Sequence, residues 1–386
     1  MTARFSFPAP DPDPAEDALR AEVRAFLDAE RASGGFSPVA DCWVSGASPE
    51  FSAKVGAQGW LGMTWPERYG GSERPPLHRH VVTEELLAAG APVAAHWVAD
   101  RQSGGHILKY GTEAQKAEIL PRIAAGTCYF AIGMSEPQAG SDLAAVQTKA
   151  TRLPGGGWRM DGRKIWSTGA HRSHYMIVLA RTSPAEGRNR QAGLSQFLVD
   201  LSTPGITISG IEDLAGSVHF NETLFDGAEL PEDALLGVEG EGWAQCMSEL
   251  AMERSGPERF LTAFLLIDET LEALRGRLDD RGHAVLGRFC AHLTALRRMS
   301  RGIARRLAEG AAPEVEAALV KELGNRLEKE TVDGVRRLLG TLPPGTTPRA
   351  LRDLLNDTIL RLPSHTLRGG TTEVMRGIIA RQLGVR

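Results

Sequence analysis

The spacing of apolar residues changes twice along the chain, and this change limits the folds open to it. Up to about residue 128, and again from about residue 233, apolar residues recur every three or four positions, as in helices with one buried face. Between residues 129 and 232 they form short runs divided by Gly and Pro, which is typical of strands. The chain is therefore predicted to place helices first, then a sheet, then helices again.

Single segments support this division. A helix is predicted over residues 15–32, where Leu19, Val23, Phe26 and Leu27 share one face. Residues 59–71 contain the Pro and Gly of a loop, and strands are predicted at residues 175–180, 196–201, 206–211 and 219–226. One long helix is predicted from a stripe with steps of three and four: Val285, Phe289, Leu293, Leu296, Met299, Ile303 and Leu307. The predicted domains are 1–128 (helical), 129–232 (β) and 233–386 (helical).

Composition and charge exclude several classes of protein. A net charge of −4 and an aromatic content of 6% give neither a basic surface nor a stacking platform for nucleic acid. No apolar run approaches the roughly 18–20 residues that cross a bilayer, and the first residues lack the pattern of a signal peptide. The four cysteines lie far apart, without histidines or carboxylates at metal-ligand spacing. We therefore expect a cytoplasmic protein with reduced thiols and no metal site.

The segment with the clearest chemistry is SEPQAGSD, residues 135–142, which follows a strand-like stretch. Such a turn offers backbone N–H groups, the hydroxyls of Ser135 and Ser141, and close approach at Gly140. These groups suit a phosphate or the edge of a flavin ring. On its own, however, a segment of this kind is usually only a turn.

Residues 129–150 resemble the acyl-CoA dehydrogenase signature (F/Y)xxTEPxAGSD, with Ser135 in place of the usual Thr. Four further segments resemble motifs of that family in the same order: residues 111–126, DGRKIWSTGA at 161–170, residues 220–243, and RGGTTEVMRGIIARQLGV at 368–385. Together they extend the resemblance over roughly residues 15–386.

The resemblance implies a mainly α fold with a central β-barrel domain, a C-terminal four-helix bundle, and FAD held between the last two. Trp166 would pack on the isoalloxazine face and Thr168 would lie near its reactive edge, although Trp166 also fits a half-buried strand aromatic. The residues implied to bind the cofactor are Ile132, Met134, Ser135, Ser141, Trp166, Ser167, Thr168, Thr371 and Glu373.

The reaction implied is removal of hydrogen across the Cα–Cβ bond of an acyl thioester, which needs a carboxylate base. Many members of the family carry that glutamate where this chain has Gly369. In one subset it lies on the helix after the β domain, in a pattern that LAMERSGPERF resembles, so Glu253 is the candidate base. Gly369 would then leave room for it and polarise the thioester carbonyl through its N–H. Glu258 is a nearby alternative, and loss of catalysis is the competing explanation.

The remaining predictions concern ligands and partners. Ser141, Arg254 and Gly370 are the implied substrate-binding residues, and an electron-transfer flavoprotein is the implied electron acceptor. The chain would form a homotetramer or a homodimer. Residues 336–351 lack the Q-x-x-G-G-x-G segment that holds the adenine end of FAD in many members, so a hetero-oligomer whose partner completes the site is also open. These departures resemble actinobacterial members that act on bulky acyl chains, such as sterol side-chain thioesters.

Three alternative functions stay open. The thioester could be carried by an acyl-carrier protein instead of CoA. The chain could also be a flavin monooxygenase of the same fold, or a non-catalytic partner subunit of a hetero-oligomeric dehydrogenase.

Overall fold

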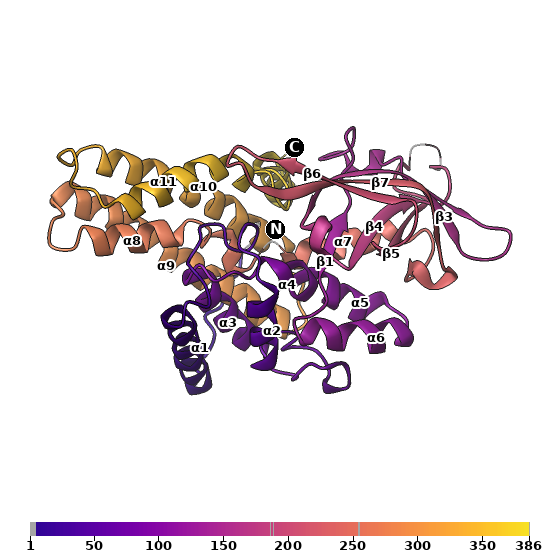
Figure 1. Ribbon diagram of the computed structural model, residues 1–386, viewed down its shortest axis with the longest axis horizontal. Coiled ribbons are helices and arrows are strands. Elements are labelled where there is room, and N and C mark those ends of the chain that lie inside the picture. The colour runs from indigo at the N-terminus through magenta and orange to yellow at the C-terminus, as the bar shows by residue number, and fades with distance from the viewer. Residues whose placement is uncertain (1–4, 186, 188, 254, 386) are drawn as a thin grey trace. The chain divides into compact units, whose positions relative to one another are not determined.

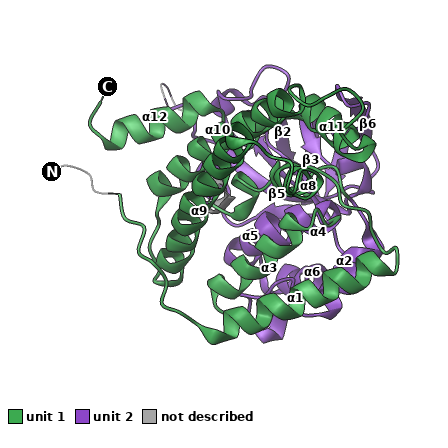
Figure 2. Ribbon diagram, turned by 90° about the vertical axis from the view of Figure 1, so that its left-hand side faces the viewer, with its two compact units in different colours: residues 1–46, 74–92, 253–386 green, residues 47–73, 93–252 purple. Residues whose placement is uncertain are grey.

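The computed structural model describes residues 5–185, 187, 189–253 and 255–385, except for the side chains of residues 249–253 (Figure 1). Contacts divide the chain into two compact units: unit 1 is formed by residues 1–46, 74–92 and 253–386, and unit 2 by residues 47–73 and 93–252 (Figure 2). This grouping follows compactness and not chain order, and the predicted domain boundaries at 128/129 and 232/233 stay a prediction. Within the described ranges, no helix combines the length and the apolar character that crossing a bilayer requires.

Unit 1 is helical, and its long helices pack on one another. Helix α10 contacts α8, α9, α11 and α12, while α1 and α9 both contact α3. The predicted first helix is confirmed, because Leu19, Val23 and Leu27 are buried on α1 and Asp13 caps its first turn. The helices of this unit are α1 (Pro14–Ala32), α3 (Pro76–Ala88), the 3₁₀ turn η6 (Pro257–Arg259), α8 (Phe264–Ala273), α9 (Asp280–Ala308), α10 (Glu314–Leu339), α11 (Arg349–His365) and α12 (Thr372–Gln382).

The apolar stripe predicted for the long helix lies on α9 and is confirmed in its middle part. Phe289, Leu296 and Ile303 are buried. The prediction was wrong for Leu307, which is 37% exposed because it stands one residue before the end of the helix. The stripe also missed Leu286, which is buried beside the predicted Val285.

Unit 2 places helices beside a mixed sheet. Thr112 and Gln115 form a capping box at the start of α6, so the N–H groups of this helix end are satisfied locally. The predicted loop at residues 59–71 is confirmed and contains one short 3₁₀ turn. The helices of unit 2 are α2 (Pro49–Ala57), η1 (Glu67–Tyr69), α4 (Ala94–Val98), the π-helical turn η2 (Ala99–Ser103), α5 (Gly104–Tyr110), α6 (Glu113–Ala124), η3 (Leu143–Ala145), η4 (Ala170–Arg172), η5 (Glu232–Ala234) and α7 (Gly242–Glu253), whose last residue falls in unit 1.

The sheet confirms all four strands predicted from apolar runs. Its order is β6-β7-β3-β2-β4-β5-β8, and β1 pairs with β4 in parallel. The strands at the two ends of this order, β6 and β8, do not pair with each other in the described residues. The sheet is therefore not a closed barrel, and the barrel prediction is not confirmed. Its core includes Trp158 and Phe197, whose rings meet edge to face at 5.1 Å. The strands are β1 (Phe130–Gly133), β2 (Lys149–Arg152), β3 (Trp158–Thr168), β4 (Tyr175–Arg181), β5 (Leu194–Asp200), β6 (Ile206–Glu212), β7 (Val218–Leu230) and β8 (Leu235–Leu236).

Candidate active site

Two of the predicted motif segments meet in unit 2. The turn after β1 lies against β3, since the Ile165 N–H donates to the Ser135 carbonyl at 2.9 Å. The Lys164 ammonium donates to the Met134 carbonyl at 3.1 Å. The structure therefore brings Met134 and Ser135 beside the strand that carries Trp166, as the sequence predicts for one binding surface.

A buried ion pair holds the turn after β1 against β3. The Lys164 Nζ lies 2.8 Å from the Glu136 Oε1, and the two side chains are 0% and 1% exposed. Glu136 also accepts the backbone N–H groups of Gln147 and Thr148 at 2.7 and 2.9 Å, so one carboxylate holds both ends of the turn. The position of residues 134–148 thus depends on a pair of charges removed from water.

The charge state of this pair follows from its surroundings. Burial acts to raise the pKa of Glu136, but the Lys164 charge and the hydrogen bonds to the carboxylate outweigh it, and the pKa is lowered. Burial lowers the pKa of Lys164 to about 8, although the Glu136 charge opposes the change. Each member of the pair therefore favours the charged form of the other.

Trp166 is presented to the surface by an irregularity in β3. The register with β7 shifts between Lys164 and Ser167, and Trp166 lies there in the left-handed region with φ 63°. Its side chain is 57% exposed, and Phe220 meets its ring edge on at 6.0 Å. An exposed indole on a strand residue with a left-handed backbone conformation is unusual.

Three other residues predicted to bind the cofactor are more buried than Trp166. The Ser167 hydroxyl is buried and has no hydrogen-bond partner among the described residues, so it faces away from the exposed indole. Thr168 and Ile132 are half-buried. A cofactor contact by Ser167 stays a prediction, and this geometry limits it to the backbone.

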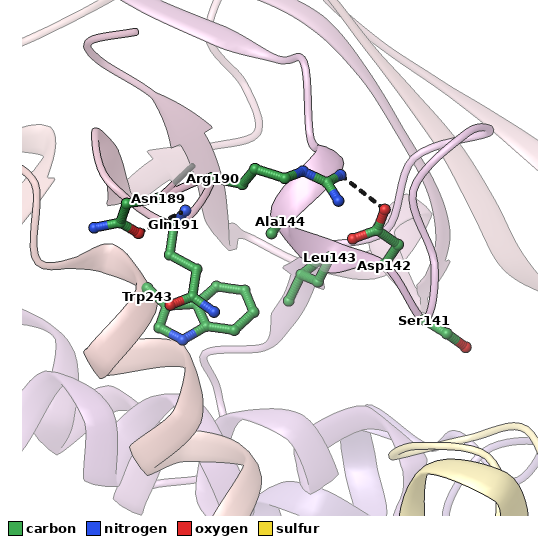
Figure 3. Close-up of a pocket in the computed structure, with 8 residues that line it drawn as sticks. All are labelled: Ser141, Asp142, Leu143, Ala144, Asn189, Arg190, Gln191 and Trp243. Atoms are coloured by element: carbon green, nitrogen blue, oxygen red, sulfur yellow. Dashed lines mark hydrogen bonds and ion pairs between the residues drawn. The ribbon is translucent and has the colours of Figure 1, made fainter. Parts of the chain in front are cut away.

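Ser141 is one of eight residues that line a pocket of about 370 Å³ in unit 2 (Figure 3). Two of the other lining residues form an ion pair, with the Arg190 Nη2 2.8 Å from the Asp142 Oδ2 and both side chains more than half exposed. The pocket is large enough for part of a small-molecule ligand. It is lined by Ser141, Asp142, Leu143, Ala144, Asn189, Arg190, Gln191 and Trp243.

In unit 1, the C-terminal motif forms a tight turn before α12. Gly369 and Gly370 have φ of 64° and 100°, a conformation that a residue with a Cβ adopts only with strain. Thr371 caps α12 by accepting the Val374 N–H. Glu373 is exposed, and its pKa is lowered by its own backbone N–H and then by the Thr371 hydroxyl. Because the φ of Gly369 is positive, a residue with a side-chain base would be strained at this position.

The predicted base can be placed only in part. Glu253 is the last residue of α7, and its side chain lies outside the described residues, as does all of Arg254. The alternative carboxylate, Glu258, is not on the same helix: it belongs to η6, is 2% exposed and lies 3.9 Å from Arg259. Its burial beside a cation favours a structural role.

Sequence reasoning missed Lys164, Glu136 and Arg190. A signal for the first existed, because Lys164 stands in an alternating strand at a position that faces inward, and a buried lysine requires a partner. No local pattern pointed to Arg190, which follows β4 in a polar segment.

Comparison with known proteins yields one family along the chain. Residues 13–127 match the acyl-CoA dehydrogenase N-terminal domain, residues 131–227 the middle domain, and residues 240–384 the C-terminal domain. Acyl-CoA dehydrogenase IpdE1 of Mycobacterium tuberculosis is 32% identical over 380 residues, which cover 95% of this chain and 96% of that protein.

Two solved structures extend this likeness to the fold. One is described as Tcur3481-Tcur3483 steroid ACAD, with a TM-score of 0.84 at 26% identity, covering 99% of this chain and 100% of that chain. The other is the ChsE4-ChsE5 complex from Mycobacterium tuberculosis, with a TM-score of 0.81 at 28% identity, covering 100% of this chain and 99% of that chain.

Proposed function

The chain belongs to the acyl-CoA dehydrogenase family of FAD-dependent oxidoreductases, and on that premise we propose that it converts an acyl-CoA to the trans-2-enoyl-CoA with Glu253 as base. The observation that carries this proposal is the exposed Trp166 indole, held beside the turn that begins at Met134. These residues fit an isoalloxazine ring, because an apolar face, a backbone edge and hydroxyl groups adjoin there.

The proposed roles of this chain's residues follow from the needs of the reaction. FAD, when bound, would supply the acceptor for the hydride that leaves the β-carbon. The Glu253 carboxylate removes the α-proton, and the electron pair of that C–H bond forms the new double bond. The Gly369 N–H stabilises the negative charge that develops on the thioester oxygen. Thr371 and Glu373 would contact the cofactor, and Arg254 and Gly370 the substrate.

We expect that Trp166→Ala weakens FAD binding about tenfold, because the apolar contact with one ring face is lost. The measurement is the FAD dissociation constant, from quenching of flavin fluorescence on titration with apoprotein. Trp166→Phe should restore most of the affinity. Leu214→Ala is the control, since Leu214 is also a large apolar residue of unit 2 and is 73% exposed. Equal affinity in the Trp166→Ala variant and the wild type would remove Trp166 from the site.

We also propose that the pocket beside Ser141 holds the nucleotide end of the thioester, where Arg190 would face a phosphate. Arg190→Gln is expected to raise KM for an acyl-CoA about five- to tenfold, and to leave KM unchanged for the same acyl group on pantetheine. Steady-state kinetics with both substrates test this. The control is Arg159→Gln, an exposed arginine of β3 that pairs with Asp161. A rise in KM for both substrates would contradict a nucleotide contact.

A partner subunit is the second candidate, and two observations favour it. Residues 336–351 lack the segment expected for the adenine end of FAD, and two similar structures are described by pairs of proteins. The name of one of them suggests a steroid thioester as the acyl group. An electron-transfer flavoprotein is proposed as the acceptor.

Purifying the chain alone separates these functions. A yellow protein that bleaches anaerobically with an acyl-CoA supports the proposed dehydrogenase, and bleaching only by a carrier-protein thioester identifies that substrate instead. A colourless protein indicates a subunit that needs a partner. Oxygen uptake linked to substrate turnover indicates a monooxygenase.

A further inference from the structure

Arg368, the residue before the two glycines, is held by buried groups of unit 1. Its Nη1 lies 2.9 Å from both carboxylate oxygens of Asp41, and its guanidinium carbon lies 4.4 Å from the centre of the Trp43 ring. The Lys321 ammonium donates to the Arg368 carbonyl. Both the side chain and the backbone of Arg368 are therefore anchored.

The groups that hold Arg368 are themselves buried, and two of them are hydrogen-bonded to their surroundings. Asp41 is 2% exposed, has φ 54°, and its carbonyl accepts the N–H groups of Val44 and Ser45 at 2.9 and 3.0 Å. The Asp41 N–H donates to the Thr262 carbonyl, and the Trp43 Nε1 donates to the Thr262 hydroxyl at 3.3 Å. Lys321 is fully buried on α10. A movement of Arg368 would have to disturb this packed framework.

The turn beyond Arg368 begins with two glycines. Gly369 and Gly370 carry no side chains, and glycine has the widest choice of backbone conformations. The direction of the Gly369 N–H therefore depends on how its predecessor is fixed. The Lys321 contact acts directly on this direction, because the Arg368 carbonyl and the Gly369 N–H belong to the same planar peptide group.

We propose that Asp41 and Lys321 are positioning residues for the dehydrogenation, because they fix Arg368 and thereby orient the Gly369 N–H toward the thioester carbonyl. This inference rests on the proposed function, which assigns that N–H to the developing oxyanion. Both residues are buried, and the proposal gives neither of them a contact with the substrate. Their effect is on the alignment of a donor whose contribution depends on being fixed in advance.

Two variants test the anchor with little change of shape. Asp41→Asn removes the charge, and asparagine tolerates the left-handed backbone of this position. Lys321→Met keeps an unbranched stem without the donor. The control is Arg376→Gln, which removes an ion pair to Glu322 at 2.9 Å that joins α12 to α10 and lies beyond the turn.

Three quantities are measured on the full-length protein with bound FAD: kcat and KM for an acyl-CoA, FAD per chain, and hydrogen exchange of the amides of residues 369–371. For both variants we expect kcat to fall about tenfold or more, because a donor displaced by a fraction of an ångström loses much of its effect. KM and FAD content should stay within about twofold, and amide exchange in the turn should become at least about tenfold faster. Arg376→Gln should change none of these by more than about twofold.

The outcomes separate the inference from the proposed function. A wild-type kcat in both anchor variants, or a loss of kcat in step with the loss of FAD, would overturn the positioning role while leaving the dehydrogenase intact. A wild-type protein that no acyl-CoA bleaches would overturn the proposed function. In that case, hydrogen exchange of the amides of residues 369–371 still shows whether Asp41 and Lys321 hold the turn. Unchanged exchange in both variants would refute this role.

Discussion

Replacing Glu253 by glutamine is expected to slow the anaerobic bleaching of the flavin by an acyl-CoA at least about 10³-fold, with FAD still bound. The amide has nearly the shape of the carboxylate but cannot accept the α-proton. The decisive measurement is stopped-flow absorbance near the flavin maximum with one equivalent of thioester. FAD content and thermal stability are recorded in parallel, so that loss of chemistry is not confused with loss of the fold.

Two carboxylate variants make this test specific. Asp268→Asn changes an exposed carboxylate of α8 and should bleach as the wild type does. Glu258→Gln changes the buried carboxylate beside Arg259, so we expect it to lower stability and to affect bleaching only in step with unfolding. If Glu253→Gln bleaches normally while Glu258→Gln is folded, yellow and inert, the base is Glu258. If neither variant is impaired, catalysis uses another group or another chain.

Replacing Lys164 by methionine is expected to lower the free energy of unfolding by about 3–5 kcal/mol, the largest stability change that we predict for one substitution. The apolar stem of the lysine is preserved, but the Glu136 carboxylate stays buried without its counter-charge. The Met134 carbonyl also loses its donor. Because the same contacts hold the turn at residues 134–148, the variant should also retain less FAD. Urea unfolding at a fixed FAD concentration measures the first effect, since the cofactor itself stabilises the folded state.

The adjacent residue of β3 provides a matched control. Arg163 forms an exposed ion pair with Glu222 at 3.6 Å, and Arg163→Gln should change the free energy of unfolding by less than about 1 kcal/mol. In the double variant Lys164→Met/Glu136→Gln neither charge of this pair remains, so more than half of the lost stability should return. Similar urea midpoints for Lys164→Met and Arg163→Gln would show that the buried pair contributes little.

Local patterns in the sequence predicted the elements well. Residues such as Leu19, Val23 and Leu27 share a helix face because of helical geometry alone, and the same reasoning located the strands from Tyr175 and Leu194 onward. The motif resemblance also located the turn at Ser135 and the strand of Trp166. These features depend on residues that are close to each other in the sequence. They can therefore be predicted from the order of the residues alone.

The tertiary structure decided what depends on distant residues. The exposure of Trp166 follows from a shift in register with β7, and the open path of the sheet follows from pairings between strands far apart in the chain. Lys164 meets Glu136 across 28 residues, and Arg368 meets Asp41 across 327. Spacing cannot predict such contacts, because the partners meet only when the chain folds, and a charge that folding buries then needs a partner to offset its loss of water.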